Sequence, residues 1–559
     1  MDYIKQYRLW CQKVKDQELE AELVSMEGNE SAIKDAFYRD LSFGTAGLRG
    51  ELGVGTNRMN VYTVGKASQG LADYLKKQYE NPSVAIAYDS RIKSDVFAKL
   101  AASILAANGI QVHIWSQLMP VPALSYAVRA LETDAGIVVT ASHNPSKYNG
   151  YKVYGADGGQ ITSKAAGAIL GESEQLDIFQ DVQQSDFEEA LSDGKIQYIS
   201  DDVYTGFIEA VKNQSVLFGD EIDKNIAIVY TPLNGAGLGP VTRTLQEAGY
   251  TNITVVKEQE MPNGNFPTCP YPNPEIREAM ALGIEYAERQ KADLLLATDP
   301  DCDRVGIAVR DVTGEYVLLS GNQVGVLLLD YICSQRVKHG RMPEDPVFVK
   351  TIVSTDLCGQ IAEHYGVKTK NVLTGFKYIG EQIGQLEACG KADSYIFGFE
   401  ESYGYLSGSY VRDKDAVNGS LLICEMFCYY ASQGISLVDR LHMIYDQYGY
   451  CLNRVYSYSF EGAAGFETMQ QIMAEFRDLS DDLCGYRIEQ KLDYAQGIDG
   501  LPRADVVKFV LEDSCSVIVR PSGTEPKIKV YVTVCAESKD VAENWEQELE
   551  KKMELYFQK

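Results

Sequence analysis

The strongest constraint on the fold is a strand–loop–helix–strand pattern that occurs three times along the chain. Its copies span residues 84–140, 226–298 and 347–400. The strands are short, continuous apolar runs such as VAIAY at 84–88, which is typical of strands buried in a parallel sheet. In the first copy, Ser94 is expected to cap a helix that ends at Gly109. The pattern predicts three successive α/β units, and such sheets place ligands beyond the carboxyl ends of their strands.

The last part of the chain follows a sparser pattern. After about residue 445, expected strands at 453–460 and 507–511 alternate with helices, and a charged helix is expected at 537–556. This predicts a smaller α+β domain, in keeping with the three or four domains that 559 residues suggest at about 150 residues each. No low-complexity linker separates the segments, so we expect the domains to pack together. The expected domains are 1–200, 201–320, 321–445 and 446–559.

The charge balance excludes several classes of function. Lys and Arg number 52 and Asp and Glu number 79, which gives a formal net charge of −27. Such an acidic chain is not expected to bind nucleic acid or an anionic membrane. An anionic substrate would need a local cluster of Lys and Arg. No apolar run approaches the roughly 20 residues that span a bilayer, and the start of the chain lacks the apolar region of a signal peptide.

The cysteines favour a reducing compartment. The sequence has twelve, none of them in a C-x-x-C pair, which is typical of unpaired core cysteines in a cytoplasmic protein. We therefore expect a cytoplasmic location. The sequence leaves the oligomeric state open between monomer and dimer.

The first chemically notable loop is TASHNP at 140–145, where a strand delivers Ser142 onto a turn-forming Asn-Pro. The G-x-S-x-G pattern of a serine hydrolase is missing, and a plain polar turn is the alternative. His143 stays among the catalytic candidates as the neighbour of Ser142, although adjacent side chains at a strand end point apart, which disfavours it as a base for that serine. Lys147 and Lys152 add positive charge nearby. The loop therefore suggests a hydroxyl that carries or contacts phosphate.

The second loop is DPDCDR at 299–304, with three carboxylates at alternate positions. Carboxylates so spaced can converge on one hard cation, and an acidic surface turn is the alternative. An EF-hand is disfavoured because its sixth position is Arg304 instead of Gly and its twelfth is Arg310 instead of Glu. Mg²⁺ is the favoured ion, and Arg304 favours a phosphate as its remaining partner.

Three further loops are less specific when read alone. The paired acids of GFEESYG at 398–404 suit either glycosidase chemistry or recognition of sugar hydroxyls. RPSGTEPK at 520–527 offers a guanidinium, hydroxyls and a glycine amide to a phosphate, with a basic turn as the alternative. FGTAGLRG at 43–50 is glycine-rich and basic, but it lacks the spacing of a dinucleotide-binding loop.

In order along the chain, this set of loops resembles the α-D-phosphohexomutase family, which includes phosphoglucomutases and phosphomannomutases. The resemblance covers nearly the whole chain and rests on GTAGLRG, TASHNP, DPDCDR, GFEESYG and RPSGTEP. It implies a four-domain α/β architecture, with three similar α/β domains and a C-terminal α+β domain like the TATA-binding protein. Those domains would carry, in order, a phosphoserine loop, a metal loop, a sugar-recognition loop and a phosphate-binding loop.

The resemblance also implies roles for individual residues. Ser142 would donate and receive the phosphoryl group, and Lys152 would be a proton-transfer group. The implied catalytic residues are Ser142, Lys152, Arg49 and Arg304, to which we add His143. The implied ligands of Mg²⁺ are Ser142, Asp299, Asp301 and Asp303. The implied substrate-binding residues are Glu400, Ser402, Lys377, Lys350, Arg520, Ser522, Gly523, Thr524 and Lys527.

The sugar loop departs from part of the family. There the serine is followed by Gly-His, whereas here Ser402 is followed by Tyr403 and Gly404, so that histidine is missing as a proton-transfer group. The runs at 374–383 and 401–417 resemble the branch of bacterial α-phosphoglucomutases and phosphopentomutase-like enzymes. This implies interconversion of glucose 1-phosphate and glucose 6-phosphate, with glucose 1,6-bisphosphate as intermediate and activator.

Other functions stay open at this point. Phosphopentomutase, phosphomannomutase and glucose 1,6-bisphosphate synthase would use the same serine and metal loop. A sugar-phosphate-binding protein without catalysis is disfavoured because Ser142 and the three aspartates are all present. A phosphatase with a D-x-D site is disfavoured because a serine outside the aspartate loop supplies the nucleophile.

Overall fold

The computed structural model describes residues 2–41, 44, 47–460, 462–498, 500–512, 515–522 and 527–557, with no side-chain description for 462–464. Contacts divide the chain into two compact units. The first unit comprises Met1–Leu319, Gly380–Asp393 and Tyr403–Cys428. The second unit comprises Ser320–Ile379, Ser394–Ser402 and Tyr429–Lys559. No helix in the part of the chain that the structure describes has the length and apolarity that a bilayer crossing requires.

The first unit begins with three short helices that form a small core of their own. They are α1 (Tyr3–Lys13), α2 (Gln17–Ser25) and α3 (Glu30–Phe37). Asp2, Asp16 and Asn29 cap their N-termini by accepting backbone N–H bonds, as short polar side chains do at this position. Trp10 is fully buried among the aromatic rings of this cluster. Aromatic packing around Trp10 therefore stabilises these helices, which precede the first strand of the unit.

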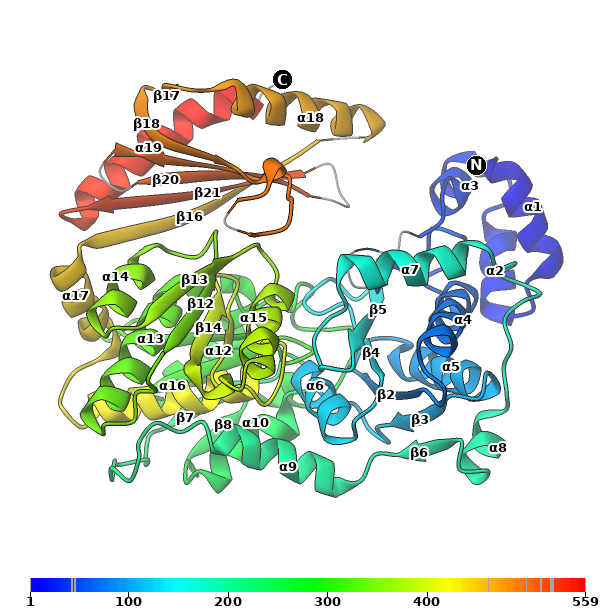
Figure 1. Cartoon of the computed structure of the whole chain (residues 1–559), viewed down its shortest axis with the longest axis horizontal. Helices are drawn as coiled ribbons and strands as arrows, with labels where there is room; N and C mark the ends of the chain where they lie inside the picture. Colours follow the sequence, from blue (N-terminus) through cyan, green and yellow to red (C-terminus); the bar gives the residue numbers. More distant parts are fainter. Residues whose placement is uncertain are drawn as a thin grey trace. The chain divides into compact units, whose positions relative to one another are not determined.

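The first sheet has six strands in the order β1-β5-β4-β2-β3-β6. The strands are β1 (Gly47–Glu51), β5 (Tyr148–Gly155), β4 (Ala135–Val139), β2 (Ser83–Tyr88), β3 (Gln111–Ile114) and β6 (Ile196–Tyr198). The helices of this region are α4 (Val61–Gln78), α5 (Ser94–Ala107), α6 (Val121–Ala130), α7 (Ser163–Glu174) and α8 (Phe187–Ser192). The main core lies between one sheet face and α4, α5 and α7, whereas α6 packs on the other face (Figure 1). Because β4 and β2 are parallel neighbours, their carboxyl ends meet at one edge.

The second sheet also belongs to the first unit, in the order β11-β10-β9-β7-β8. Its strands are β11 (Tyr316–Leu319), β10 (Val305–Arg310), β9 (Leu294–Thr298), β7 (Ile228–Thr231) and β8 (Ile253–Val255). The helices here are α9 (Asp201–Lys212), α10 (Leu238–Glu247), α11 (Lys257–Glu260) and α12 (Arg277–Gln290). Strand β9 is completely buried and pairs antiparallel with β10, so the loop between them reverses the chain at the end of β9.

The second unit contains three parallel strands in the order β13-β12-β14. They are β13 (Lys368–Val372), β12 (Val347–Thr351) and β14 (Tyr395–Glu400). The helices of this part of the chain are α13 (Gly321–Lys338), α14 (Leu357–His364), α15 (Phe376–Ala388), α16 (Ala416–Ala431) and α17 (Leu437–Tyr448). The unit boundary falls within α15 and α16, and β15 (Gly404–Leu406) belongs to the first unit.

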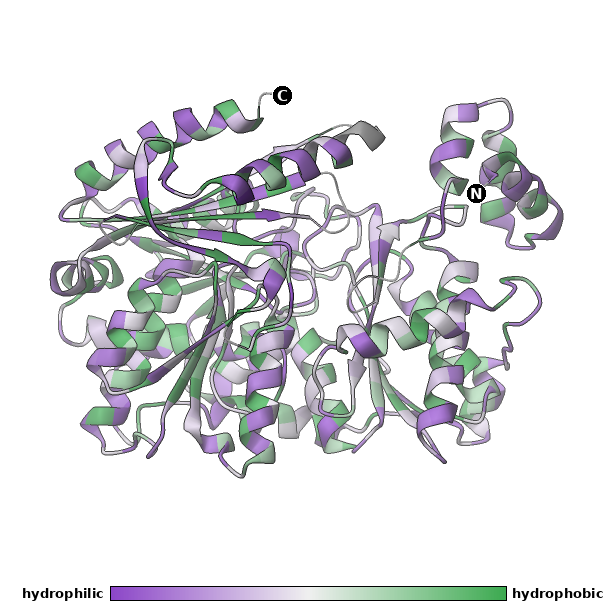
Figure 2. Ribbon diagram, turned by 45° about the horizontal axis from the view of Figure 1, so that its top comes forward, coloured by the Kyte–Doolittle hydropathy of each residue, from purple (hydrophilic) through white to green (hydrophobic). Residues whose placement is uncertain are grey.

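The last sheet is antiparallel and belongs to the second unit, in the order β16-β21-β20-β19-β18-β17. Its strands are β16 (Tyr450–Ser459), β21 (Lys527–Ala536), β20 (Ser516–Pro521), β19 (Val507–Leu511), β18 (Tyr486–Asp493) and β17 (Asp482–Leu483). Helices α18 (Gly462–Asp478) and α19 (Lys539–Phe557) cover one face, and apolar side chains fill the space between them and the sheet. Figure 2 shows green, apolar residues both in the strands and in the helices, and several helices alternate between green and purple along their length.

The structure confirms the predicted α/β class and most of the predicted elements. Strands β12 and β19 have the predicted bounds, 347–351 and 507–511. The expected cap at Ser94 is wrong, because Lys93 is the N-cap and the Ser94 hydroxyl donates to Asp89 instead. The domain boundaries expected from the sequence stay a prediction.

Candidate active site

The candidate nucleophile lies on a strained turn directly after β4. Ser142 is buried and has a backbone φ of +51°, a left-handed conformation that residues with a Cβ rarely adopt. Its N–H donates to the Thr140 hydroxyl at 2.8 Å. That hydroxyl lies 2.6 Å from an oxygen of Asp89, which follows the neighbouring strand β2. The turn is therefore held by side chains that come from the same edge of the sheet.

The three aspartates of the second loop converge as the sequence predicts. Asp299, Asp301 and Asp303 are all buried, and each offers a carboxylate oxygen within 4.8 Å of the others. The chain reversal between β9 and β10 produces this convergence. Within it, Asp299 Oδ1 accepts the backbone N–H bonds of Asp303, at 3.1 Å, and of Arg304, at 3.0 Å. The loop thus orients its own first carboxylate.

The triad has the properties of a cation site. Asp301 Oδ1 and Asp303 Oδ1 are buried and accept no hydrogen bond in the described part of the chain, and Asp303 Oδ2 is balanced by the Lys414 ammonium at 2.8 Å. Buried carboxylate oxygens without a hydrogen-bond donor are costly unless a cation binds them, and oxygen ligands of this kind suit a hard divalent ion. The residues present fit a divalent metal.

The serine and the triad form one centre. The Ser142 hydroxyl donates to Asp299 Oδ2 at 2.8 Å, although the two residues are separated by 157 positions in the sequence. The Thr140 hydroxyl lies 3.2 Å from Asp301 Oδ2. A phosphoryl group on Ser142 would therefore lie next to the metal ligands.

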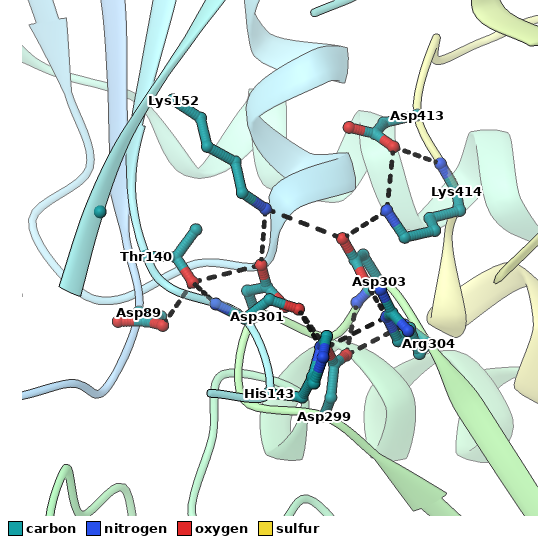
Figure 3. A network of polar contacts seen from close by, with 12 residues as sticks. Asp89, Thr140, His143, Lys152, Asp299, Asp301, Asp303, Arg304, Asp413 and Lys414 are labelled. Carbon is teal, nitrogen blue, oxygen red and sulfur yellow. Dashed lines mark hydrogen bonds and ion pairs between the residues drawn. The ribbon is translucent and has the colours of Figure 1, made fainter. Parts of the chain in front are cut away.

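Three cationic side chains surround the triad, as Figure 3 shows. Lys152 Nζ lies 3.0 Å from Asp301 Oδ2, and Lys414 Nζ lies 2.8 Å from Asp303 Oδ2. Arg304 Nε lies 3.6 Å from Asp303 Oδ1, while its Nη1 donates to Glu275 at 2.6 Å. These three cations are the local group of Lys and Arg that an anionic substrate would need, and the carboxylates of the triad balance their charge.

The crowding of the carboxylates shifts their protonation. Burial and the charges of Asp301 and Asp303 raise the pKa of Asp299 well above its usual value. Burial acts in the same direction on Asp301, but Lys152, the hydrogen bond with Asp299 and Lys414 hold the pKa of Asp301 below its usual value. Opposed shifts in one small cluster are typical of functional sites.

The structure corrects the expectation that the side chains of Ser142 and His143 point apart. The Ser142 Oγ lies 3.2 Å from His143 Nδ1, because the left-handed turn replaces the extended backbone on which that expectation depended. Burial, with the positive charges of Arg304 and Arg49, lowers the pKa of His143 well below its usual value. The imidazole is therefore neutral near pH 7. Its role as a catalytic residue stays a prediction.

Arg49 lies beside the serine turn. It occupies the middle of β1, opposite Gly150 of β5, and its Nη1 donates to Asn144 Oδ1 at 3.4 Å. Lys152 belongs to the same strand pair, opposite Gly47. The antiparallel pairing of β1 with β5 thus brings two of the predicted basic residues to one place.

The predicted sugar-binding residues belong to the second unit. Glu400 ends β14, is buried, and accepts the Gly375 N–H bond at 3.0 Å. Ser402 lies two residues further along the chain, and Lys377 is half-buried at the start of α15, with its Nζ 5.0 Å from the Tyr378 ring centroid. Lys350 is buried and donates to Ser354 O at 3.0 Å and to Asp356 Oδ1 at 2.9 Å. The Lys350 amine is thus held by the protein itself, and its role toward substrate stays a prediction.

The predicted phosphate loop is described only in part. Arg520 and Ser522 lie at the end of β20 and just after it, and the Ser522 N–H donates to Lys527 O at 2.7 Å. Burial raises the pKa of Tyr531; Glu401, the residue after Glu400, acts in the same direction, and Arg520 opposes it. Gly523 and Thr524 lie outside the described residues.

Sequence reasoning missed several residues of the site. Lys414 follows the sugar loop in sequence but contacts the metal loop, where it also lies 3.5 Å from Asp413. Asp89 and Arg91 follow strand β2 and contact the serine turn. A polar Asp-Ser-Arg run directly after a buried strand was a signal that could have identified the last two.

A buried serine beside three converging carboxylates and three cations, on α/β sheets, defines an enzyme of the phosphoryl-transfer class. Family comparison then identifies it further. Four domains described as "Phosphoglucomutase/phosphomannomutase" match the chain: alpha/beta/alpha domain I over residues 40–177, domain II over 205–314, domain III over 320–448, and the C-terminal domain over 466–552. The chain belongs to this family of intramolecular phosphotransferases, and the aspartate triad has the ligands that a divalent metal site requires.

Individual relatives agree with this assignment. The chain is 35% identical over 542 residues to a phosphoglucomutase of Staphylococcus saprophyticus, covering 92% of this chain and 96% of that one. It is 36% identical over 558 residues to a phosphoglucomutase of Staphylococcus aureus, covering 96% and 97%.

Solved structures show the same fold. A putative phosphomannomutase from Thermus thermophilus has a TM-score of 0.69 at 22% identity, covering 92% of this chain and 99% of that one. The pp63/parafusin phosphoglucomutase from Paramecium, in its open form, has a TM-score of 0.70 at 18% identity, covering 93% and 96%.

Proposed function

We propose that this enzyme is an α-phosphoglucomutase, which interconverts glucose 1-phosphate and glucose 6-phosphate through a phosphoserine at Ser142 and a glucose 1,6-bisphosphate intermediate. The observation that carries the proposal is the hydrogen bond from Ser142 to the buried aspartate triad, in a chain whose full-length relatives are phosphoglucomutases. We further propose that the reaction takes place in the cytoplasm, because the sequence has the cysteine usage of a reducing compartment.

The local geometry explains how Ser142 can act as a phosphoryl carrier. Its Oγ is oriented by Asp299 and by His143, both within hydrogen-bond distance, so the attacking atom has few alternative positions. Fixed orientation is a large part of catalysis in phosphoryl transfer, since the transferred group needs in-line positioning more than covalent chemistry. The buried position of Ser142 also limits access of water, whose attack on the phosphoserine is the competing reaction.

The metal and the cations supply charge neutralisation. We propose that Asp299, Asp301, Asp303 and an oxygen on Ser142 hold Mg²⁺, which when bound would offset the negative charge of the phosphoryl group. Lys152 and Arg304 lie at the triad and would contact the remaining phosphate oxygens. Lys152 is also the proposed proton-transfer group, and Arg49 lines the reaction centre.

The second unit would supply substrate recognition. Glu400 and Ser402 would bind sugar hydroxyls, because a carboxylate accepts hydrogen bonds from them and a hydroxyl can do both. The phosphate that is not being transferred would bind to Arg520, Ser522, Gly523, Thr524 and Lys527. Lys377 and Lys350 would contribute positive charge to substrate binding.

A competition assay tests the sugar specificity. Purified enzyme receives Mg²⁺, a trace of glucose 1,6-bisphosphate, and the 1-phosphates of glucose, mannose and ribose in one tube, followed by ³¹P NMR. Fastest conversion of the glucose ester to its 6-phosphate supports the proposal. Faster conversion of the mannose or ribose ester would assign the enzyme to a sibling activity instead. Sustained release of inorganic phosphate would indicate a phosphatase.

The serine is tested separately by Ser142→Ala, with Ser432→Ala as a matched control on the exposed end of a helix. We expect the Ser142 variant to lose mutase turnover and the mass increase of phosphorylation, because Ser142 Oγ is the acceptor that Asp299 and His143 orient. The control should keep both. Full turnover by pure Ser142→Ala protein would refute the assigned role of Ser142.

A further inference from the structure

Arg91 binds the backbone of the serine turn, residues 142–148, through its guanidinium. It is 2% exposed and follows the end of β2. Its guanidinium donates to four backbone carbonyls of one segment, those of Ser142, Asn144, Pro145 and Tyr148, the last two at 3.0 Å each. A single side chain thus binds carbonyls that span residues 142–148.

The arrangement is specific to a guanidinium. Arg presents its N–H donors in a rigid planar fork, which can meet several acceptors at once, whereas the Lys ammonium is a point charge. Asp89 binds Arg91 at two places: its Oδ1 accepts the backbone N–H of Arg91 at 2.9 Å, and its Oδ2 lies 3.5 Å from the guanidinium Nε. The Arg91 guanidinium also lies 5.1 Å from the ring centroid of Phe266. These contacts restrict rotation of the Arg91 guanidinium.

The segment that Arg91 binds contains the strained residue Ser142. Ser142 is in a left-handed conformation that a side chain disfavours, and such conformations persist only where the surroundings enforce them. The carbonyl of Ser142 is one of the Arg91 acceptors, and the Ser142 hydroxyl is the group that reaches Asp299 at 2.8 Å. Release of the carbonyl would let the backbone relax and move the hydroxyl away from the metal ligands.

We infer that Arg91 is a positioning residue for phosphoryl transfer: through its bonds to the carbonyls of the serine turn it holds Ser142 Oγ in the attacking geometry. This inference rests on the proposed function. Arg91 touches neither substrate nor metal in this role. It acts on the rate at which Ser142 takes up and gives back the phosphoryl group.

A positioning role and a merely structural role differ in what they change. Loss of a structural arginine lowers thermal stability and the amount of folded enzyme, but leaves the folded fraction active. Loss of the positioning arginine lowers kcat of the folded enzyme and leaves KM for glucose 1-phosphate nearly constant, since the residues proposed to bind the sugar are elsewhere in the chain. A displacement of about 1 Å at the reacting atom can cost about 100-fold in rate.

The test compares Arg91→Ala and Arg91→Lys with Arg440→Ala. Arg440 is a matched control, because it also makes a mostly buried contact, to Asp330 at 2.6 Å, but lies far from residues 142–148 in sequence and belongs to the second unit. For each protein we would measure the thermal midpoint, KM, kcat per folded molecule, and the single-turnover rate of Ser142 phosphorylation by glucose 1,6-bisphosphate, followed by intact mass.

We expect Arg91→Ala to lose about 100-fold in the single-turnover rate and in kcat, and Arg91→Lys to recover only part of it. Added guanidinium ion should restore Arg91→Ala several-fold, whereas equal concentrations of sodium chloride should not. Arg440→Ala should lose stability but keep its single-turnover rate.

Two outcomes would overturn the inference. One is a folded Arg91→Ala protein that phosphorylates Ser142 at a rate close to wild type. The other is an equal loss of rate in Arg440→Ala at a comparable loss of stability, because destabilisation alone would then explain the effect. Failure of the proposed function is a separate result, because wild-type enzyme would then show no mutase turnover, while the ratio of variant to wild-type phosphorylation by the bisphosphate could still be measured.

Discussion

Replacement of Lys414 by methionine should tighten Mg²⁺ binding while it weakens the metal-free protein. The Lys414 ammonium is nearly buried and lies 2.8 Å from Asp303 Oδ2, one of the carboxylates proposed to hold the metal. The ammonium and a divalent cation therefore compete for the same carboxylate. Methionine keeps most of the volume of the lysine stem and removes only the charge.

The magnitude follows from the geometry. At an effective dielectric of about 20, two unit charges 2.8 Å apart attract each other by about 6 kcal/mol. Desolvation of the ammonium offsets part of this, and loss of one partner of a buried ion pair costs about 3–5 kcal/mol. We expect the metal-free variant to be destabilised by that amount. Because Lys152 continues to compete at Asp301, we expect only about 1.4 kcal/mol to appear as tighter metal binding, which is about 10-fold in Kd.

The assay is calorimetric titration of the metal-free protein with Mg²⁺, together with thermal midpoints with and without the ion. The control is Lys195→Met, which removes an exposed lysine that pairs with Asp193 at 3.3 Å on the surface. Exposed pairs contribute about 0–1 kcal/mol, so the control should match wild type in both measurements. A Lys414→Met protein that binds Mg²⁺ no more tightly than wild type would refute the competition between ammonium and metal.

Two further predictions concern ionisable groups outside the reaction. Burial raises the pKa of Asp356, but Lys350 and Lys508 bring it down to about 2, so the ionised carboxylate contributes stability above pH 4 that is lost as the pH falls to 2. The thermal midpoint of wild type should therefore exceed that of Asp356→Asn at pH 5 and above, and the difference should shrink between pH 4 and pH 2; a constant difference would contradict the assigned pKa. Burial raises the pKa of the Cys302 thiol well above its usual value, so this cysteine inside the metal loop should be inert as a thiolate. In the native enzyme, mass-spectrometric mapping of iodoacetamide labelling should find the exposed Cys11 and Cys389 labelled first and Cys302 only after unfolding; early labelling of Cys302 would contradict its burial.

Much of the fold could be predicted from local sequence pattern. Mainly apolar runs such as VFVKT at 347–351 and VKFVL at 507–511 coincide with strands because a buried strand needs mostly apolar side chains on both faces. Local rules failed where a tertiary contact competed with them. Ser94 has the chemistry of a helix cap, but its hydroxyl donates to Asp89, and Lys93 takes the cap position in a left-handed conformation.

The same division applies to the active site. The aspartate triad could be read from the sequence because its three carboxylates lie on one short loop, where spacing alone brings them together. The contact between Ser142 and His143 could not, because it depends on a backbone conformation that the serine rarely adopts by itself. The hydrogen bonds of Arg91 to the turn explain how that conformation is maintained.

By itself, the sequence determined the chemistry of each loop: which one carries a hydroxyl, which one carries carboxylates, and that the chain is built of α/β units. Only the tertiary structure decided which cations meet the carboxylates. Lys152 reaches Asp301 across 149 positions, and Lys414 reaches Asp303 across 111 (414 − 303), whereas the predicted Lys350 is held by Asp356. The physical reason is that charge acts through space. A lysine becomes part of a site through strand order and loop path, and these are properties of the packed sheets.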